Sequence, residues 1–237
     1  MPTDSMFRVY ALSMTRMPTT DGARRTRERV LSAALELFNE RGSAAVTTNH
    51  VAARAGISPG NLYYWFSDKD EIVRELYAQF VAAYEQVWGT GNGDGLDPGG
   101  PLDLTPDDVL ARLAGGAALS GRYTFLARDL LGLLHSDPVL AEQYRAVRER
   151  RITEFRDLAR TWRTKGLIRP LDDQTVDDLV HALWIIAEMW WAFGEIDGSY
   201  SGAEDGPRLL RVVLRPYLGH DEESVAKKVA EELPAAR

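Results

Sequence analysis

Residues 47–69 place the strongest constraint on the fold, because their sequence TTNHVAARAGISPGNLYYWFSDK separates two short helices by a tight turn. Small apolar residues around Val51 give the first helix a narrow buried face. Gly56 ends it, since glycine adopts the left-handed backbone of a helix terminus at little cost. Ser58 then caps a second helix, and Pro59 occupies its first turn, where the missing N–H is harmless. This spacing predicts a helix-turn-helix, a motif that places its second helix in the major groove of DNA.

The second of these helices ends in polar and aromatic residues. The side chains that we expect at its exposed end are Asn61, Tyr63, Tyr64 and Trp65. Hydroxyl and amide groups can donate hydrogen bonds to phosphates, and aromatic rings can contact sugars and thymine methyl groups. Tyr63 and Phe66 lie three residues apart, so the alternative is that they pack beneath the helix. We expect this packing for Phe66, and for Tyr63 both interpretations stay open.

Charge is distributed unevenly along the 237 residues. The formal net charge is −7, which by itself argues against binding to nucleic acid. Residues 1–67 nevertheless carry +3 and residues 68–237 carry −10, so only the N-terminal part attracts phosphate. The candidates for contacts to the DNA backbone or minor groove are Arg24, Arg25 and Arg27. A solvated face of the helix predicted for residues 24–41 is the alternative.

The rest of the chain shows helical periodicity. A long helix is predicted for residues 69–88, and further helices for residues 105–119, 121–135, 139–165, 172–196 and 207–218. No segment shows sustained two-residue alternation, so we predict an all-α fold. The predicted parts are a flexible N-terminal arm (1–23), the helix-turn-helix domain (24–70), a Gly-rich linker (89–104), a second helical domain (105–220) and a charged tail (221–237).

Residue patterns typical of enzymes, metal sites and membrane spans are not found. The chain has no cysteine and four dispersed histidines. Residues 56–60 read G-x-S-x-G, but the nucleophile elbow of hydrolases requires a preceding strand. The apolar stretch 179–193 includes His181 and Glu188 and is shorter than the ~20 residues that a membrane span needs. We therefore expect a cytoplasmic, non-enzymatic protein with no cofactor, no metal and no membrane partner.

Three consecutive motifs resemble the TetR family of bacterial transcriptional regulators. They are VLSAALELFNERG, TTNHVAARAG and SPGNLYYWFSDKDEI, and the resemblance runs from Arg24 to about Tyr77. It implies DNA contacts from Thr48, Ser58, Pro59, Gly60, Asn61, Tyr63, Tyr64, Trp65 and Lys69. Trp65 stands where many members have His or Tyr. Lys69 opposes the dipole at the start of its helix, which favours a phosphate partner.

The family also implies a homodimer, whose last two long helices form a four-helix bundle, and a helical domain that binds an effector. Aromatic residues are frequent there. The ligand-contact candidates are Tyr123, Phe125, Arg128, Phe155, Trp162, Ile186, Met189, Trp190 and Phe193. A stripe that includes Trp184, Glu188 and Trp191 is either dimer interface or pocket lining. Arg128 and the arginines between 145 and 151 can serve an anionic ligand, such as an acyl thioester of coenzyme A, or form a solvated face.

Together these features predict a ligand-responsive, homodimeric DNA-binding regulator. We expect a repressor that a small, largely apolar effector releases from a palindromic double-stranded DNA operator. The alternative is a helical small-molecule-binding or scaffold protein without sequence-specific DNA binding, which the net negative charge favours. The two predictions differ in whether the phenol groups of Tyr63 and Tyr64 face outward.

Overall fold

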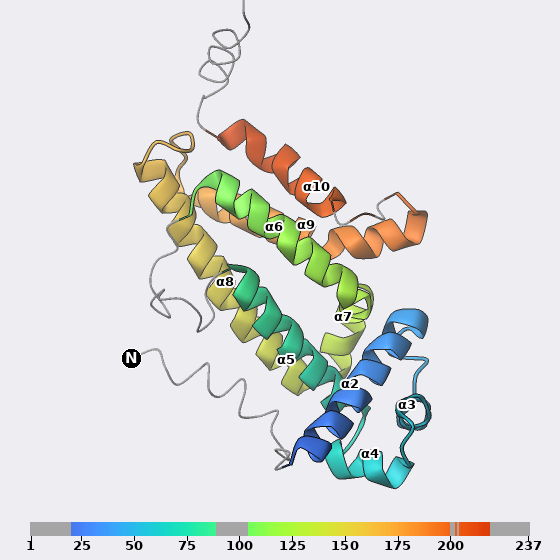
Figure 1. The fold of residues 1–237 in the computed structure, drawn as a ribbon. Coiled ribbons are helices and arrows are strands. Elements are labelled where there is room, and N and C mark those ends of the chain that lie inside the picture. Colours follow the sequence, from blue (N-terminus) through green and yellow to red (C-terminus); the bar gives the residue numbers. More distant parts are fainter. Residues whose placement is uncertain (1–19, 89–103, 200–201, 203, 219–237) are drawn as a thin grey trace, which may run out of the picture.

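A computed structural model describes residues 20–88, 104–199, 202 and 204–218 of the chain. These residues form nine α-helices, one short 3-10 helix and no strand, which confirms the predicted all-α fold. The helices, labelled as in Figure 1, are α2 (Asp21–Arg41), α3 (Thr48–Ala55), α4 (Pro59–Trp65), α5 (Lys69–Trp88), α6 (Pro106–Arg122), α7 (Thr124–Ser136), α8 (Pro138–Thr164), α9 (Asp173–Asp197), α10 (Asp205–Leu214) and η1 (Arg215–Tyr217).

The predicted helices are present, with differences at their ends. α2 begins at Asp21, because the Thr20 side chain accepts a hydrogen bond from the Ala23 N–H at 3.2 Å and caps the first turn. The prediction of a flexible arm is therefore wrong for residues 20–23. The rest of that arm, most of the predicted linker and the predicted tail lie outside the described residues.

The turn between α3 and α4 forms as the sequence predicts. Gly56 has a φ of +66°, the left-handed conformation that ends α3. Ser58 caps α4, since its Oγ accepts a hydrogen bond from the Asn61 N–H at 3.2 Å. Leu62 and Phe66 are buried, so one face of α4 is fixed against the core. The opposite face is left for other contacts.

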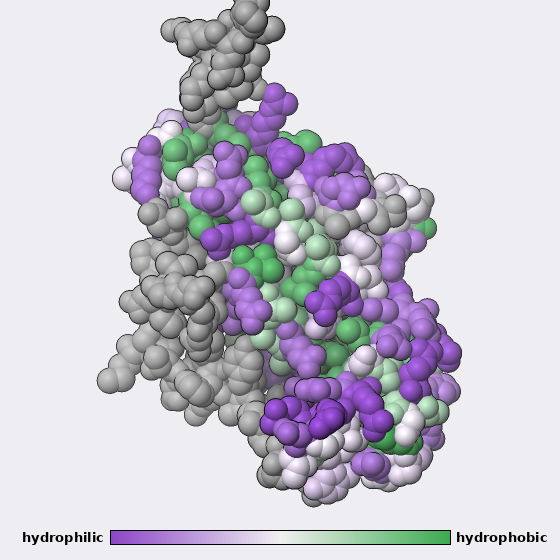
Figure 2. Space-filling view, viewed as in Figure 1, coloured by the Kyte–Doolittle hydropathy of each residue, from purple (hydrophilic) through white to green (hydrophobic). Residues whose placement is uncertain are grey.

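Helices α2, α3 and α4 form one end of the molecule, and α6, α9 and α10 lie toward the other end (Figure 1). α5 begins directly after α4 and runs into the second group beside α8. α10 packs on α9 and α6, while α7 contacts α2, α8 and α9. In Figure 2, hydrophilic residues cover much of the end formed by α2–α4, and apolar residues reach the surface in the middle of the same face.

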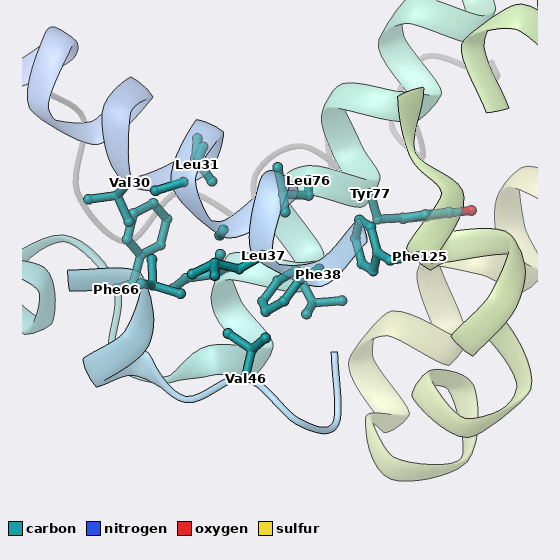
Figure 3. Close-up of a cluster of buried hydrophobic side chains, with 14 of the residues drawn as sticks. Val30, Leu31, Leu37, Phe38, Val46, Phe66, Leu76, Tyr77 and Phe125 are labelled. Atoms are coloured by element: carbon teal, nitrogen blue, oxygen red, sulfur yellow. The ribbon is translucent and has the colours of Figure 1, made fainter. Parts of the chain in front are cut away.

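One apolar cluster holds the N-terminal helices to the rest of the protein. Phe38 of α2 and Phe125 of α7 are fully buried, with ring centroids 5.2 Å apart. Figure 3 shows the cluster extending from Val30 and Phe66 on one side to Tyr77 and Phe125 on the other. Burial of each large apolar side chain contributes about 1.5–3 kcal/mol. The core is therefore continuous across the boundary predicted between the two domains.

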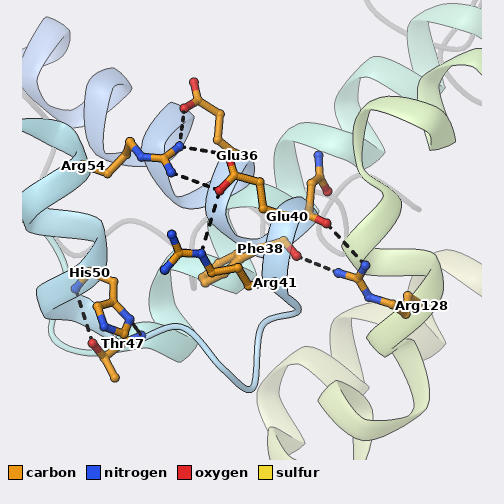
Figure 4. A network of polar contacts seen from close by, with 9 residues as sticks. Glu36, Phe38, Glu40, Arg41, Thr47, His50, Arg54 and Arg128 are labelled. Atoms are coloured by element: carbon orange, nitrogen blue, oxygen red, sulfur yellow. Dashed lines mark hydrogen bonds and ion pairs between the residues drawn. The ribbon is translucent and has the colours of Figure 1, made fainter.

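Polar contacts reinforce this junction at the C-terminal end of α2 (Figure 4). Arg128 of α7 donates hydrogen bonds to the carbonyl oxygens of Phe38, at 2.7 Å, and Asn39, at 3.3 Å. Carbonyl groups in the last turn of a helix attract positive charge. The Asp129 carboxylate accepts hydrogen bonds from the N–H and the hydroxyl of Ser43, both at 2.7 Å. Arg128 and Asp129 of α7 therefore hold the C-terminal end of α2 and the residues that follow it through hydrogen bonds.

The side chain of Asn39 completes the junction. Its Nδ2 donates a hydrogen bond to the Arg122 carbonyl at 2.9 Å, and its Oδ1 accepts one from the Phe125 N–H at 3.1 Å. Phe125 is the second residue of α7, so this N–H has no partner within its own helix. A side chain of α2 thus caps α7.

Replacing Asn39 with alanine should lower the free energy of unfolding by about 1–2 kcal/mol, because the Phe125 N–H loses its partner in a partly buried place. The matched control is Asn49→Ala: Asn49 is exposed on α3, and its loss should change the free energy by less than about 0.5 kcal/mol. Chemical denaturation followed by circular dichroism measures both values. Equal effects in the two variants would contradict the capping role of Asn39.

Candidate DNA-binding surface and internal cavity

α4 presents its polar and aromatic side chains to solvent. Tyr63 is 52% exposed and Tyr64 54%. The other exposed residues of this surface are Ser58, Pro59, Gly60 and Asn61. Apart from its own helix, no described residue has an atom within 4 Å of the position that a Cβ would occupy at Gly60. The backbone at the start of α4 is therefore open to close approach by another molecule.

Tyr63 belongs to this surface and does not pack beneath the helix. Its hydroxyl is 2.9 Å from Oγ1 of Thr48, a half-buried residue in the first turn of α3, and the two groups form a hydrogen bond. Phe66 is the residue that packs beneath α4, with 1% of its surface exposed. The bond between Thr48 and Tyr63 makes α3 and α4 one continuous surface.

Trp65, a predicted DNA contact, turns partly away from that surface. It is half-buried against the core of the N-terminal helices, and its indole N–H is buried without a hydrogen-bond partner. A buried N–H cannot donate to a phosphate, so the placement of Trp65 does not support the predicted contact. Its ring packs edge to face against the ring of Tyr64, with centroids 4.8 Å apart. This contact helps to position the Tyr64 side chain.

Two further predicted DNA contacts have partners within the chain. Arg27 forms a bidentate ion pair with Glu75 of α5, at 2.9 and 3.1 Å, and its guanidinium lies 5.2 Å from the ring centroid of Phe66. Arg27 thus links α2 to α5, and its guanidinium is already occupied by a partner within the chain. Lys69 donates a hydrogen bond to the Ser43 carbonyl at 2.8 Å. Its partner within the chain is therefore this carbonyl, whereas the sequence predicted a phosphate. An ammonium group has three donors, so Lys69 can still bind an anion.

Arg24 and Arg25 lie exposed near the start of α2. A nitrogen of Arg24 is 3.6 Å from the Asp21 carboxylate, and these two side chains are 62% and 77% exposed. Arg25 donates a hydrogen bond to the Asp21 carbonyl at 3.4 Å. Exposed ion pairs contribute little to stability, so both guanidinium groups can exchange these partners for a phosphate.

A cavity of about 220 Å³ lies among α5–α10. One water molecule needs only about 10–15 Å³ by the same measure. Four predicted ligand contacts line it: Tyr123, Phe155, Trp162 and Trp190. Residues that we did not assign to the ligand also line it, among them Tyr84, Tyr144 and Arg151. α10 closes the cavity at Gly206, where a Cβ would overlap the indole of Trp190.

The other five predicted ligand contacts do not line the cavity. Phe125 packs on Phe38 and Arg128 holds the end of α2, while Ile186, Met189 and Phe193 lie on other faces of α9, with Phe193 62% exposed. The inward-facing residues of α9 include the mixed stripe of Trp184, Glu188 and Trp191. The prediction that Ile186, Met189 and Phe193 line the cavity is therefore wrong. Of the two interpretations of the mixed stripe, the positions of Trp184, Glu188 and Trp191 agree with pocket lining.

Among the described residues that line the cavity, Glu188 alone is acidic. Burial raises the pKa of its carboxyl, because the charged form is poorly solvated. A hydrogen bond donated by the Tyr144 hydroxyl opposes this shift, as do Trp184 and Arg148. Burial, followed by the charge of Glu188, also raises the pKa of Tyr144. No Lys, Arg or His nitrogen in the described part of the chain lies within 4.0 Å of the Glu188 carboxylate.

The arginines near the cavity are compensated within the chain. Arg151 is 2% exposed, donates a hydrogen bond to Glu154 at 2.8 Å and lies 6.0 Å from the ring centroid of Tyr84. Arg150 forms an ion pair with Glu85. These pairs do not support Arg150 and Arg151 as a site for an anionic ligand, and Arg145 and Arg148 do not line the cavity.

α9 and α10 expose apolar side chains on the outside of the molecule. Ile185, Phe193 and Ile196 of α9 are 58%, 62% and 81% exposed, and Val212 of α10 is 64% exposed. By length and composition alone, residues 173–196 of α9 are long and apolar enough to cross a membrane. The predicted helix 172–196 matches α9, whereas the stretch 179–193 was too short a basis for judging a membrane span. An exposed apolar strip of this kind marks a contact surface.

This architecture is that of a helix-turn-helix protein with a helical domain built around a cavity. Two family models match it: "Bacterial regulatory proteins, tetR family" over residues 30–76 and "Bacterial transcriptional repressor", the TetR model, over residues 95–222. The second model alone covers more than half of the chain. The protein belongs to the TetR family, as its three motifs predicted.

Individual relatives are similar over shorter stretches. YdeS of Bacillus subtilis, an uncharacterised HTH-type transcriptional regulator, is 28% identical over 51% of this chain and 55% of its own length. The HTH-type transcriptional repressor KstR2 of Rhodococcus jostii is 39% identical over 30% of this chain and 37% of its own length. The chain thus matches about half or less of these curated relatives.

Solved structures are similar over most of the chain. A TetR-family transcriptional regulator from Marinobacter aquaeolei is 27% identical, with a TM-score of 0.72 over 87% of this chain and 97% of that one. The SmeT–triclosan complex has a TM-score of 0.57 and 21% identity, over 83% of this chain and 93% of that one. This second likeness shows the fold alone.

Replacing Glu188 with glutamine should raise the temperature of unfolding at the high end of a pH series, where the carboxyl is ionised in the folded protein. The folded-state pKa of Glu188 is raised above its value in the unfolded chain. Its contribution to stability is therefore full below the unfolded-state pKa and is lost as the pH rises through the folded-state pKa. Glutamine removes the buried charge, so its advantage should shrink as the pH falls.

Thermal unfolding over a series of pH values measures this effect. The matched control is Glu142→Gln, because Glu142 is an exposed residue of α8 and should show no such dependence. A Glu188→Gln protein that is less stable than the parent at every pH would contradict the assignment of Glu188 as a poorly solvated acid without a cationic partner.

Proposed function

We propose that the protein is a DNA-binding transcriptional regulator: a homodimeric repressor that leaves its operator when a small ligand occupies the cavity. The observation that carries this proposal is the outward presentation of Tyr63 and Tyr64 on α4, beside the open backbone of Gly60. Leu62 and Phe66 anchor the opposite face. A helix held by one face, with donors and rings on the other, is suited to the major groove.

The N-terminal ends of α4 and α5 supply donors for phosphates, and exposed arginines add positive charge at the start of α2. Phosphate contacts position such a surface, and contacts to base edges give it specificity. The proposed DNA contacts are Arg24, Arg25, Thr48, Ser58, Pro59, Gly60, Asn61, Tyr63, Tyr64 and Lys69. Arg27 and Trp65 are left out, because their partners within the chain hold them elsewhere.

Two copies are needed, because one short helix contacts only a few base pairs. A two-fold dimer would present α4 twice, with a separation of about 34–36 Å between successive major grooves. The exposed apolar strip of Ile185, Phe193, Ile196 and Val212 supports a dimer formed by α9 and α10. This use of the strip favours a cytoplasmic protein over one inserted in a membrane.

α7 offers a route from the cavity to the DNA-binding end. Leu126 and Leu130 line the cavity, and between them Arg128 and Asp129 hold the end of α2. A ligand that shifts α7 therefore also shifts α2, and α4 with it. α5 adds a second route, since Tyr84 lines the cavity and the helix begins directly after α4. The effect is limited by the ligand's preference between the two conformations.

The mostly apolar wall supports a small, largely apolar effector. SmeT, which has a similar fold, has been solved in complex with triclosan, and this supports a ligand-binding role for the cavity. We propose no catalytic activity and no cofactor, because the polar groups of the cavity are explained by ligand binding.

The DNA that the purified protein enriches from a random pool should contain an inverted repeat, with half-sites about 10–10.5 base pairs apart or a multiple of that distance.

Tyr64→Ala should weaken binding to the enriched DNA about tenfold, because a ring at the groove is lost. Lys69→Ala should also reduce the slope of log K against log salt by about one unit. Fluorescence anisotropy over a series of salt concentrations measures both changes.

Lys165→Ala is the matched control for Lys69→Ala, because Lys165 is an exposed lysine at the end of α8, far along the chain from α4. It should leave the salt slope unchanged. If no DNA is enriched, the alternative of a ligand-binding or scaffold protein without DNA recognition replaces this proposal. If Tyr64→Ala binds as the parent does, α4 is not the surface that contacts DNA.

Phe193→Lys should convert the dimer to monomers, because a charge would be placed in the apolar strip of α9. The control is Leu131→Lys, since Leu131 is 60% exposed on α7, outside the proposed interface. Sedimentation velocity measures the oligomeric state, and circular dichroism checks that both variants fold. A Phe193→Lys protein that remains dimeric would place the interface elsewhere.

A further inference from the structure

Glu188 is a half-buried acid on the cavity wall. Buried carboxylates are ordinarily paired with a cation or surrounded by donors, because an uncompensated charge in an apolar environment is costly. In the described part of the chain, Glu188 receives a hydrogen bond from Tyr144 and has no cation within 4.0 Å. Glu188 lines the cavity, so a group bound in the cavity can reach it.

Aromatic rings surround this carboxylate. Trp184 and Trp191 lie about one helical turn before and after Glu188 on α9, and Tyr144 faces it from α8; all of them line the cavity. Phe155 lines the same cavity from α8. The faces of indole and phenyl rings are negative and attract cations, most strongly when the cation is shielded from water.

The single basic residue of the described cavity wall does not cancel this charge. Arg151 is already paired with Glu154 and lies over the Tyr84 ring. The neighbouring Arg150 is paired with Glu85. Both of these arginine charges are therefore paired locally. Arg148 of α8 acts on Glu188 from outside the cavity wall and lies more than 4.0 Å from its carboxylate, so Glu188 is the acid of the described wall that has no ion-pair partner there.

We propose that the cavity binds an organic cation, with its ammonium group against Glu188 and its apolar body between Trp184, Trp191 and Phe155. This inference rests on the proposed ligand-binding role of the cavity and gives the ligand a charge. A cavity of about 220 Å³ suits a compact molecule, such as an aromatic ring that carries a trimethylammonium group. The cation supplies the partner that Glu188 lacks in the chain, and its apolar body occupies the rest of the wall.

The test compares two probes of nearly equal shape that differ in charge, para-hydroxyphenyl trimethylammonium and para-tert-butylphenol. Titration calorimetry of the full chain without DNA measures both affinities. The cation should bind at least about tenfold more tightly than the neutral probe. Glu188→Gln should weaken binding of the cation about thirtyfold, because one partner of a buried charge pair is removed. The same change should leave the neutral probe within about threefold of its affinity for the parent.

The affinity for the cation should also rise with pH as Glu188 ionises, and the affinity for the neutral probe should not. The titratable and charged groups that influence Glu188 are Tyr144 and Arg148 of α8 and Tyr77 and Tyr84 of α5. Burial raises the pKa of each of these three tyrosines above its ordinary value. The tyrosines therefore stay neutral at any pH below the ordinary pKa of tyrosine. A rise that persists in Glu188→Gln would assign the effect to another group.

Glu142→Gln serves as the control for the loss of a carboxylate outside the cavity and should bind both probes as the parent does. Equal affinities of the parent for the two probes, no binding of the cation, or full binding of the cation by Glu188→Gln would each overturn the proposal. These measurements contain no DNA, so such a failure leaves the proposed DNA binding intact. A failed selection of DNA, in turn, leaves the cation site intact.

Discussion

The packing of Phe38 against Phe125 determines how the rest of this protein can act. It joins the helix-turn-helix end to α7 through one continuous apolar core, and the hydrogen bonds of Asn39, Arg128 and Asp129 fix the two helices in register. A rigid junction transmits displacement, whereas a flexible linker would absorb it. Because α7 also forms part of the cavity wall, the proposed response to a ligand would reach α4 through these packed side chains.

The sequence predicts the helix-turn-helix well because the causes are local. Gly56, Ser58 and Pro59 determine where the helices end and begin, and each acts within one turn of its own position. The long helices also follow from periodicity, since an apolar stripe requires only neighbours in the same helix. The role of Arg27 could not be found in this way, because its partner Glu75 is distant in the sequence and adjacent only in the fold.

The residues that line the cavity are harder to predict from the sequence. Its spacing on the apolar face of the helix predicts that Phe193 lies inside, yet it is 62% exposed, and Glu188 lines the cavity. Polarity indicates the orientation of a helix only when one of its faces meets water. α9 has a cavity on one side and a strip suited to another subunit on the other, so both faces depart from the usual pattern. Spacing places Trp184, Glu188 and Trp191 on one stripe, but packing of α9 against α7, α8 and α10 decides where that stripe points.

Gly206 gives the outermost helix a direct mechanical link to the interior. Hydrogen is the largest substituent that fits where α10 crosses the indole of Trp190, so a tilt of either toward the other would push on its neighbour. Rotation of one ring would be converted into a pivoting of α10. In an assembly joined through α10, the spacing of the paired helices on the duplex would then be adjusted from within each subunit.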